Sequence, residues 1–476
     1  MNNDLLFSKS HQTKLLKNVE AEYKNFIQDV RDDLKNGFTT DVVDPQFLDQ
    51  LNDIIHDEIF DGYSPLKFYW MNMLDNLIYI IQLHEEILNS EEYNEGNDEL
   101  SPIEEELHHL WQHSDMASTF EELLEEGLPV LEASDQLLPL LENQLISFYV
   151  IHINQFQQEF DDAIIYQTNH ELGDFDKRMY IGDAHHFIEL DSKPESFPSI
   201  PVKAFRPQKN EMTIEIKEED VAFKIKELKS ILTIENKSMT VVPSCEMSVK
   251  KEKHILDMLE NSFKLLKSIS TELYDSTLIF TNTIIPTFDE AMLGHSLQSL
   301  PGFSTINFAS DLKHEILANI VSENANHYLN THLNQGELVH DNNEEEYFSP
   351  WNKSPSSIKE IYHDVFTNYF VFELGIKALK ANHAKKIKLS KEEVLFFQTS
   401  MLEKSYQLDF SKSICEKAYK NKRINKAGFE ILGQMFKNLE SHKKIIQLNE
   451  NELQNSNSEA YEEVLGLKIF LEKNKN

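Results

Sequence analysis

Apolar side chains recur at helical spacing along the first third of the chain. Phe26, Val30 and Leu34 are each four residues apart, and similar spacing continues with few strand-like alternations. Because residues three and four apart share one face of an α-helix, this pattern predicts amphipathic helices over residues 4–166. Ser101 followed by Glu104 is typical of a capped helix start within this block.

The pattern changes near residue 183, where apolar and polar residues begin to alternate with a period of two. This alternation predicts short strands at 187–190, 212–216 and 231–235, with further strand candidates at 277–286 and 304–308. Prolines between the first two of these predicted strands show that the intervening segment is not one continuous element. Several of them fall close together, namely Pro194, Pro198, Pro201 and Pro207.

Helical spacing returns after residue 250 and dominates the remainder of the chain. The sequence therefore predicts a mainly α protein with a small β component, in three parts. These are an acidic helical region over residues 1–180, a β-rich connector over 181–250 and an α-rich domain over 251–476.

Acidic residues greatly outnumber basic ones. The 476 residues carry 45 Lys and Arg against 81 Asp and Glu, a net charge of −36, and residues 51–150 hold 23 acids with Lys67 as their one Lys or Arg. Such a surface repels phosphate backbones and anionic lipids, so we expect neither nucleic acid nor membrane as a partner. The acidic face is either simply solvated or a binding surface for a basic peptide.

Composition also indicates the compartment. The chain has only two cysteines, Cys245 and Cys415, which excludes a disulfide framework and a zinc site made of several cysteines. The first residues do not have the pattern of a signal peptide, and no apolar run approaches the ~18 residues of a membrane span. We therefore expect a cytoplasmic protein.

One short motif suggests metal chemistry. His314 and Glu315 lie near the start of a predicted helix. They match the first two residues of a His-Glu-x-x-His motif. That motif places two histidines four residues apart on one helical face, where both can bind one metal. The second histidine is absent here, because Ala318 occupies its position. His327 and His295 are nearby imidazoles that could replace the missing ligand.

The sequence around this motif resembles that of one protein family. A strand with Pro286, a polar loop, a second short strand and His314-Glu315 follow in order, and residues 347–355 read Tyr-Phe-Ser-Pro-Trp-Asn-Lys-Ser-Pro. Residues 361–366 then supply a histidine and an aromatic residue, and 427–428 an Ala-Gly pair. This order resembles the HExxH-type 2-oxoglutarate-dependent peptide β-hydroxylases, which modify ribosomally made peptides.

The resemblance covers about residues 275–440 and implies an Fe(II) and 2-oxoglutarate site. It implies His314 and His363 as metal ligands and Glu315 as ligand, supporting partner or base. Arg423 or Lys353 would pair with the carboxylate of 2-oxoglutarate. The implied substrate pocket contains Trp351, Asn319 and His295. Asn352 departs from the family, which usually has arginine there.

Three functions follow from these residues. The first is Fe(II)/2-oxoglutarate-dependent β-hydroxylation of a precursor peptide, with a metal site impaired at Ala318. The second is a catalytically silent peptide-binding scaffold on the same fold. The third is a zinc metallopeptidase, which the loss of the second histidine damages equally. Two explanations of Ala318 stay open: a native loss in a degenerate relative, or an engineered replacement of histidine.

Overall fold

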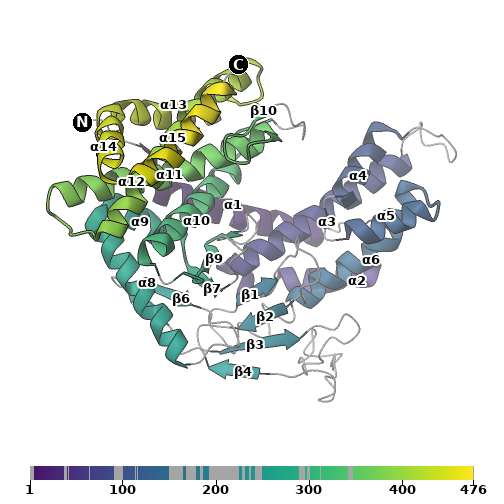
Figure 1. The fold of residues 1–476 in the computed structure, drawn as a ribbon. Coiled ribbons are helices and arrows are strands. Elements are labelled where there is room, and N and C mark those ends of the chain that lie inside the picture. The colour runs from purple at the N-terminus through teal and green to yellow at the C-terminus, as the bar shows by residue number, and fades with distance from the viewer. Residues whose placement is uncertain are drawn as a thin grey trace. The chain divides into compact units, whose positions relative to one another are not determined.

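The fold is known from a computed structural model of the chain (Figure 1). It describes the longer segments 5–36, 42–63, 65–89, 100–112, 116–149, 249–288, 301–310, 312–340 and 347–474, and residues 40 and 114. It also describes the strands at 164–167, 178–182, 186–191, 224–227, 231–234, 237–241 and 295–296.

The protein is mainly α-helical with a small β component, which confirms the fold class predicted from the sequence. The chain divides into two units, each with its own core. We call residues 20–228 the N-terminal unit, and residues 1–19 together with 229–476 the C-terminal unit. No helix in the described part of the chain combines the length and apolar character needed to cross a bilayer.

Helices form most of the C-terminal unit. They are α8 (Val249–Ile269), α9 (Thr271–Phe280), α10 (Lys313–Leu333), α11 (Ile358–His383), α12 (Lys391–Lys420), α13 (Lys426–Ser441), α14 (Lys443–Ser456) and α15 (Ser458–Lys473). The long helices α10, α11 and α12 enclose an apolar core that includes Tyr328, Phe366 and Met401. This core holds together the segments that carry the predicted metal-site residues.

A five-stranded sheet completes the C-terminal unit. Its order is β5-β6-β7-β9-β8, and β7 pairs in parallel with both β6 and β9. The strands are β5 (Ile231–Ile234), β6 (Lys237–Val241), β7 (Thr283–Thr287), β8 (His295–Ser296) and β9 (Phe303–Asn307). A separate two-stranded pair joins β10 (Tyr347–Phe348) to β11 (Pro355–Ser356).

Local sequence signals fix where the long helices begin. Ser357 and Glu360 form a reciprocal capping box at the start of α11, and Ser390 and Glu393 do the same for α12. Each box satisfies backbone N–H groups that a helix start leaves without intrahelical partners. Gly375 lets α11 and α12 pack closely, because a Cβ there would lie 2.9 Å from the Cβ of Met401.

The beginning of the chain belongs to the C-terminal unit. A short 3-10 helix, η1 (Leu5–Phe7), precedes α1 (Lys9–Lys35), whose first residues pack on this unit. The Phe7 ring lies 5.2 Å from that of Phe370. The buried Gln12 amide donates to the Leu6 carbonyl at 2.8 Å and to Ser276 Oγ at 3.1 Å. Burial and hydrogen bonds therefore anchor residues 5–12 within the C-terminal unit.

The N-terminal unit contains the rest of α1 and a group of shorter helices. These are α2 (Pro45–Ile55), η2 (Glu58–Asp61), α3 (Pro65–Asn89), α4 (Pro102–Gln112), α5 (Ala117–Glu125) and α6 (Val130–Phe148). Trp70 and Trp111 are fully buried in its core. Ser101 and Glu104 exchange hydrogen bonds at the start of α4, as the sequence predicts.

An antiparallel sheet follows these helices in the same unit. Its order is β1-β2-β3-β4, formed by β1 (Ile164–Gln167), β2 (Arg178–Gly182), β3 (His186–Asp191) and β4 (Lys224–Glu227). The prediction of a strand at 187–190 is thus confirmed. The predicted helical block extended to residue 166, and that end is wrong, because β1 pairs with β2 there.

The unit boundaries differ from the predicted domain boundaries at 180 and 250. The predicted connector over 181–250 is divided, since β4 belongs to the sheet of the N-terminal unit and β5 and β6 to that of the C-terminal unit. The reason is strand pairing: β6 pairs with β7, which lies about forty residues further along the chain. Periodicity alone contains no information on such distant partners.

The strand predicted over 277–286 is only partly correct. Thr277 and Phe280 lie in α9, and only residues from Thr283 onward form a strand. Burial on the helix outweighs the β preference of this run, and Thr277 Oγ1 donates to the Leu273 carbonyl at 2.9 Å. The strands predicted at 231–235 and 304–308 are confirmed, and 212–216 lies outside the described residues.

We expect Phe7→Ala to lower the free energy of unfolding of the C-terminal unit by about 3–5 kcal/mol, because it removes a buried ring and leaves a cavity. Lys14→Ala, an exposed change on the same segment, should alter it by no more than about 0.5 kcal/mol. Urea denaturation of the full chain measures both. Equal effects of the two variants would contradict the anchoring described above.

Candidate functional site

His314 lies in the first turn of α10 and points into the protein. It is 3% exposed, and its ring lies 4.7 Å from that of Phe396 in α12. Beside it, Lys313 Nζ forms an ion pair with Glu393 Oε1 at 2.9 Å. The N-terminal end of α10 is therefore packed against the N-terminal end of α12.

Helices α10 and α11 run antiparallel, which determines the position of His363. The Tyr328 ring lies 5.6 Å from Phe366, and the His332 ring, one turn later in α10, lies 6.4 Å from the same Phe366. His363 precedes Phe366 by almost one turn and is exposed. It thus lies toward the C-terminal end of α10, whereas His314 lies at the other end.

The structure does not bring His314 and His363 together. Fourteen residues of α10 separate His314 from Tyr328, which amounts to roughly 20 Å at ~1.5 Å per residue. Two imidazoles that share a metal have nitrogens within ~2.2 Å of it. The pair therefore does not fit a shared Fe(II), and no step of an oxygenase mechanism follows from it.

The two histidines considered as replacement metal ligands, His327 and His295, have structural contacts of their own. His327 is buried, accepts a hydrogen bond from the Gly302 N–H at 3.2 Å and contacts Ser304 Oγ at 2.9 Å. Burial lowers its pKa to about 4, so this imidazole stays neutral with both nitrogens occupied. His295 belongs to β8, where its backbone pairs with Thr305.

The remaining predicted site residues are dispersed in the C-terminal unit. Glu315 and Asn319 are half-buried in α10, and Ala318 packs against the apolar core. Lys353 is exposed, with Nζ 5.7 Å from the centre of the Phe470 ring. Trp351 also packs on the core, and the Arg423 carbonyl accepts the His340 N–H at 2.7 Å. The roles that the resemblance implies for these residues stay predictions.

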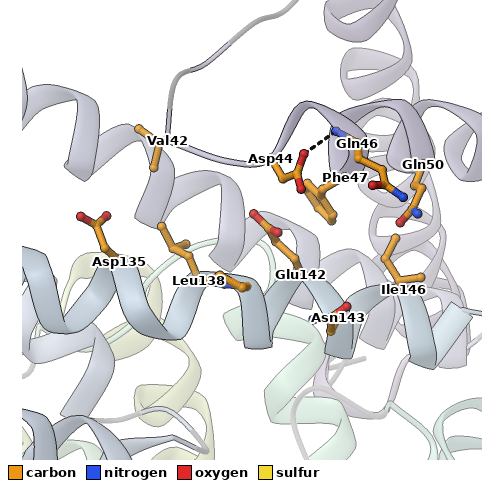
Figure 2. Close-up of a pocket in the computed structure, with 11 residues that line it drawn as sticks. Val42, Asp44, Gln46, Phe47, Gln50, Asp135, Leu138, Glu142, Asn143 and Ile146 are labelled. Carbon is orange, nitrogen blue, oxygen red and sulfur yellow. Dashed lines mark hydrogen bonds between the residues drawn. The ribbon is translucent and has the colours of Figure 1, made fainter.

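A pocket of about 320 Å³ lies in the N-terminal unit, between α2 and α6 (Figure 2). Apolar side chains form part of its wall, and carboxylates and amides form the rest. Its lining residues are Val42, Asp44, Gln46, Phe47, Gln50, Asp135, Leu138, Pro139, Glu142, Asn143 and Ile146. None of these is Lys, Arg or His, so the described residues supply three carboxylates and no basic side chain to the lining.

Glu142 is the central acid of this pocket. Only 8% of the residue is exposed, and Figure 2 shows its carboxylate directed from α6 toward that of Asp44. Burial and the negative charge of Asp44 raise the pKa of Glu142 to about 7, although the Asp44 backbone N–H donates a hydrogen bond to it. A buried carboxylate with a raised pKa would be stabilised in its ionised form by any cation that entered the pocket.

Asp44 is held in place by the start of α2. Its carboxylate accepts the Gln46 N–H at 2.8 Å as the N-cap, and Pro45 occupies the first helical position. The exposed Asp44 side chain therefore has a fixed orientation at the pocket rim. Asn could take its place as a cap with little cost to the helix.

The lining suits one chemical class of ligand. Lysine and arginine side chains combine an apolar stem with a cationic end, and the pocket offers apolar walls beside carboxylates. Its volume is at the lower end of the ~300–1,000 Å³ usual for small-ligand sites. The arrangement can therefore bind basic side chains at its carboxylates, and Gln46, Gln50 and Asn143 can donate or accept hydrogen bonds around them.

Sequence reasoning identified the acidic block but not these particular residues. Asp44-Pro45 is a recognisable helix start, and Asp135 and Glu142 are seven residues apart, on one helical face. What the sequence lacks is the burial of Glu142, which depends on α2 packing against α6. Comparison with protein-family models gives no match, and no curated protein matches the chain.

We expect Ala318→His to bind no additional Fe(II) and to gain no 2-oxoglutarate decarboxylation, because position 318 packs against the core and His363 is distant. The larger side chain should lower the free energy of unfolding by roughly 1–3 kcal/mol. Ala427→His, an exposed change in α13, is the control for an added imidazole. Stoichiometric iron with turnover in the Ala318 variant would falsify this placement of the site.

Glu142 should make stability depend on pH. Its pKa is about 7 when folded and 4.5 as the reference value for the unfolded chain, so its stabilising contribution is complete below pH 4.5 and is lost as pH rises through 7. Glu142→Gln should therefore gain roughly 1–3 kcal/mol over wild type at pH 8 compared with pH 4.5. Urea denaturation across this range, with Glu121→Gln as an exposed control, measures the difference. Parallel curves would contradict the raised pKa.

Proposed function

We propose that this protein is a peptide-binding protein that captures a basic segment through the pocket between α2 and α6. The observation that carries the proposal is Glu142, a residue only 8% exposed that lies beside Asp44 in a pocket whose described lining includes no basic side chain. Such a pair of acids is costly when both are ionised, and a bound cation relieves that cost. The site therefore favours a cationic ligand.

The shape of the pocket favours a peptide over a free cation. Its lining follows one face of α6 from Asp135 to Ile146, which spans about 16 Å at ~1.5 Å per residue. Apolar residues lie between the polar ones along this face, as Leu138 and Pro139 do between Asp135 and Glu142. An extended peptide can place basic side chains at the carboxylates and apolar atoms between them.

The charge of the surrounding unit supports the same ligand. Residues 51–150 hold 23 acids against one Lys or Arg, so the long-range field draws basic peptides to this unit. The pocket then supplies short-range contacts that a uniformly acidic surface lacks. Field and pocket together would give faster association and a preferred binding position.

Of the functions that the sequence suggests, the peptide-binding scaffold agrees best with this proposal. Peptide hydroxylation and the metallopeptidase both require histidines that share a metal, and His314 and His363 lie far apart in the C-terminal unit. The proposed binding depends on none of the residues of that predicted metal site. It therefore applies whether or not the C-terminal unit has an activity of its own.

The test uses fluorescein-labelled hexa-arginine and the full chain, with hexaglutamine as the neutral peptide. We expect Asp44→Asn with Glu142→Gln to weaken hexa-arginine binding about tenfold or more, since charge-assisted hydrogen bonds contribute roughly 1.5–3 kcal/mol. Both changes preserve side-chain size, and Asn keeps the cap of α2. Fluorescence anisotropy gives the dissociation constants, which should rise with salt.

A charge-matched variant separates the pocket from the general field. Glu121→Gln with Glu125→Gln removes the same two charges from exposed positions of α5 in the same unit. This variant should bind hexa-arginine within about twofold of wild type. If the two double variants weaken binding equally, the acidic surface attracts the peptide without a pocket and the proposal fails.

A further inference from the structure

A chain of buried side chains lies directly behind Asp135. The indole N–H of Trp111 donates to Ser134 Oγ at 2.6 Å, and Ser134 Oγ lies 2.5 Å from His84 Nε2. On the other side of the ring, His84 Nδ1 lies 3.1 Å from Asp135 Oδ1. Three helices contribute to this chain: α4 with Trp111, α3 with His84, and α6 with Ser134 and Asp135.

The donor and acceptor properties of these side chains determine the direction in which the protons are donated. An ionised carboxylate only accepts hydrogen bonds, so its contact with Nδ1 favours the His84 tautomer that has the proton on Nδ1 and an unprotonated Nε2 facing Ser134. Ser134 then donates its hydroxyl proton to Nε2 while accepting from Trp111, which only donates. Burial lowers the pKa of His84 despite the neighbouring Asp135, in keeping with a neutral ring. Trp111 and Ser134 thus donate in turn toward His84, whose other ring nitrogen lies next to the Asp135 carboxylate.

The same three residue types form the serine-histidine-aspartate triads of acyl-transfer enzymes, but here the exposure is reversed. In those enzymes the serine meets the substrate. Here Ser134 and His84 are fully buried, and the Asp135 side chain is 57% exposed at the pocket. The arrangement cannot present a nucleophile, and it presents an oriented carboxylate instead.

We infer that Trp111, Ser134 and His84 are positioning residues that orient Asp135 as a second anionic contact of the pocket, which selects peptides with two basic residues three positions apart. This inference rests on the proposed function. Asp135 and Glu142 are seven residues apart on one face of α6, about 10 Å along the helix. In an extended peptide of the polyproline II type, residues i and i+3 lie on one side about 9 Å apart.

Orientation matters because a free carboxylate on the protein surface must lose side-chain freedom when it pairs with a cation. The close contact with His84 Nδ1 restricts the Asp135 carboxylate in advance, so pairing with a cation at Asp135 costs less on binding. Ser134 contributes by donating to Nε2, which favours the tautomer with the proton on Nδ1, next to Asp135. Trp111 contributes by holding the Ser134 oxygen, which leaves its proton for His84.

The first experiment examines the series Trp111, Ser134, His84 and Asp135 without any ligand. Nitrogen-15 NMR of histidine-labelled protein reports which ring nitrogen of His84 carries the proton, with the signal assigned by its loss in His84→Gln. We expect the Nδ1–H form in the wild type and a shift toward a mixture of tautomers in Asp135→Asn, whose amide can donate or accept. An Nε2–H form in the wild type would contradict the proposed positioning of Asp135 by His84.

The second experiment examines selection. Two fluorescein-labelled alanine hexapeptides carry either one arginine or two arginines three positions apart. In the wild type the two-arginine peptide should bind at least fivefold more tightly, beyond the twofold that two equivalent residues give statistically. Asp135→Asn and Ser134→Ala should reduce this ratio to about two, and Ser134→Thr, which keeps a hydroxyl, should restore part of it.

The two peptides distinguish positioning from mere structural support. A variant that only loosens the fold weakens binding of both peptides and leaves their ratio unchanged, and that result would contradict the inference. Loss of the proposed function itself has another signature: neither peptide would respond to Asp44→Asn with Glu142→Gln. The ratio in Asp135→Asn, an exposed change, decides the question even if Ser134→Ala fails to fold.

Discussion

An ionised side chain that leaves water must be paired, hydrogen-bonded or neutralised, and this constraint explains most of the informative positions in both units. Glu373, buried in α11, accepts hydrogen bonds from Tyr369 and His442, each at 3.1 Å. Burial alone would raise the pKa of Glu373, but the neighbouring His442 and Lys377 hold it below its ordinary value. Glu142 has no such cationic partner among the residues that the structure describes, and its pKa rises to about 7. The first acid is satisfied within the fold, whereas the second is suited to a ligand.

The antiparallel packing of α10 and α11 has the largest consequence for the chemistry that the sequence suggests. A motif such as His314 followed by Glu315 has meaning only if other ligands reach the same point in space. Ring contacts between Tyr328, His332 and Phe366 fix the relative direction of the two helices. That direction leaves His314 against Phe396, at the far end of α10 from His363. The resemblance to peptide hydroxylases can therefore describe an order of sequence elements without implying a working metal centre.

The proposed binding site uses the features in which this chain is most unusual. The excess of acids is concentrated in the N-terminal unit, where a few of them line a pocket and most of the others that the structure describes are exposed. Charge of one sign over a wide surface attracts basic partners but discriminates poorly among them. Discrimination requires carboxylates with fixed positions, which the cap of α2 provides for Asp44 and the contact with His84 provides for Asp135. Field and pocket thus have separate tasks in recognition.

The sequence by itself determined the mainly α class, several strands and the capped starts of helices such as the one at Ser101, because these depend on residues within a few positions of one another. It also located the acid excess. Tertiary structure alone decided that residues 5–19 belong to the C-terminal unit, that β6 pairs with β7 and that Glu142 is buried. Each of these depends on partners distant in sequence, and burial is a property of the packed fold. The local sequence around a helical Glu does not show whether its carboxylate faces water or another acid such as Asp44. Only the packing of the helices distinguishes the two cases.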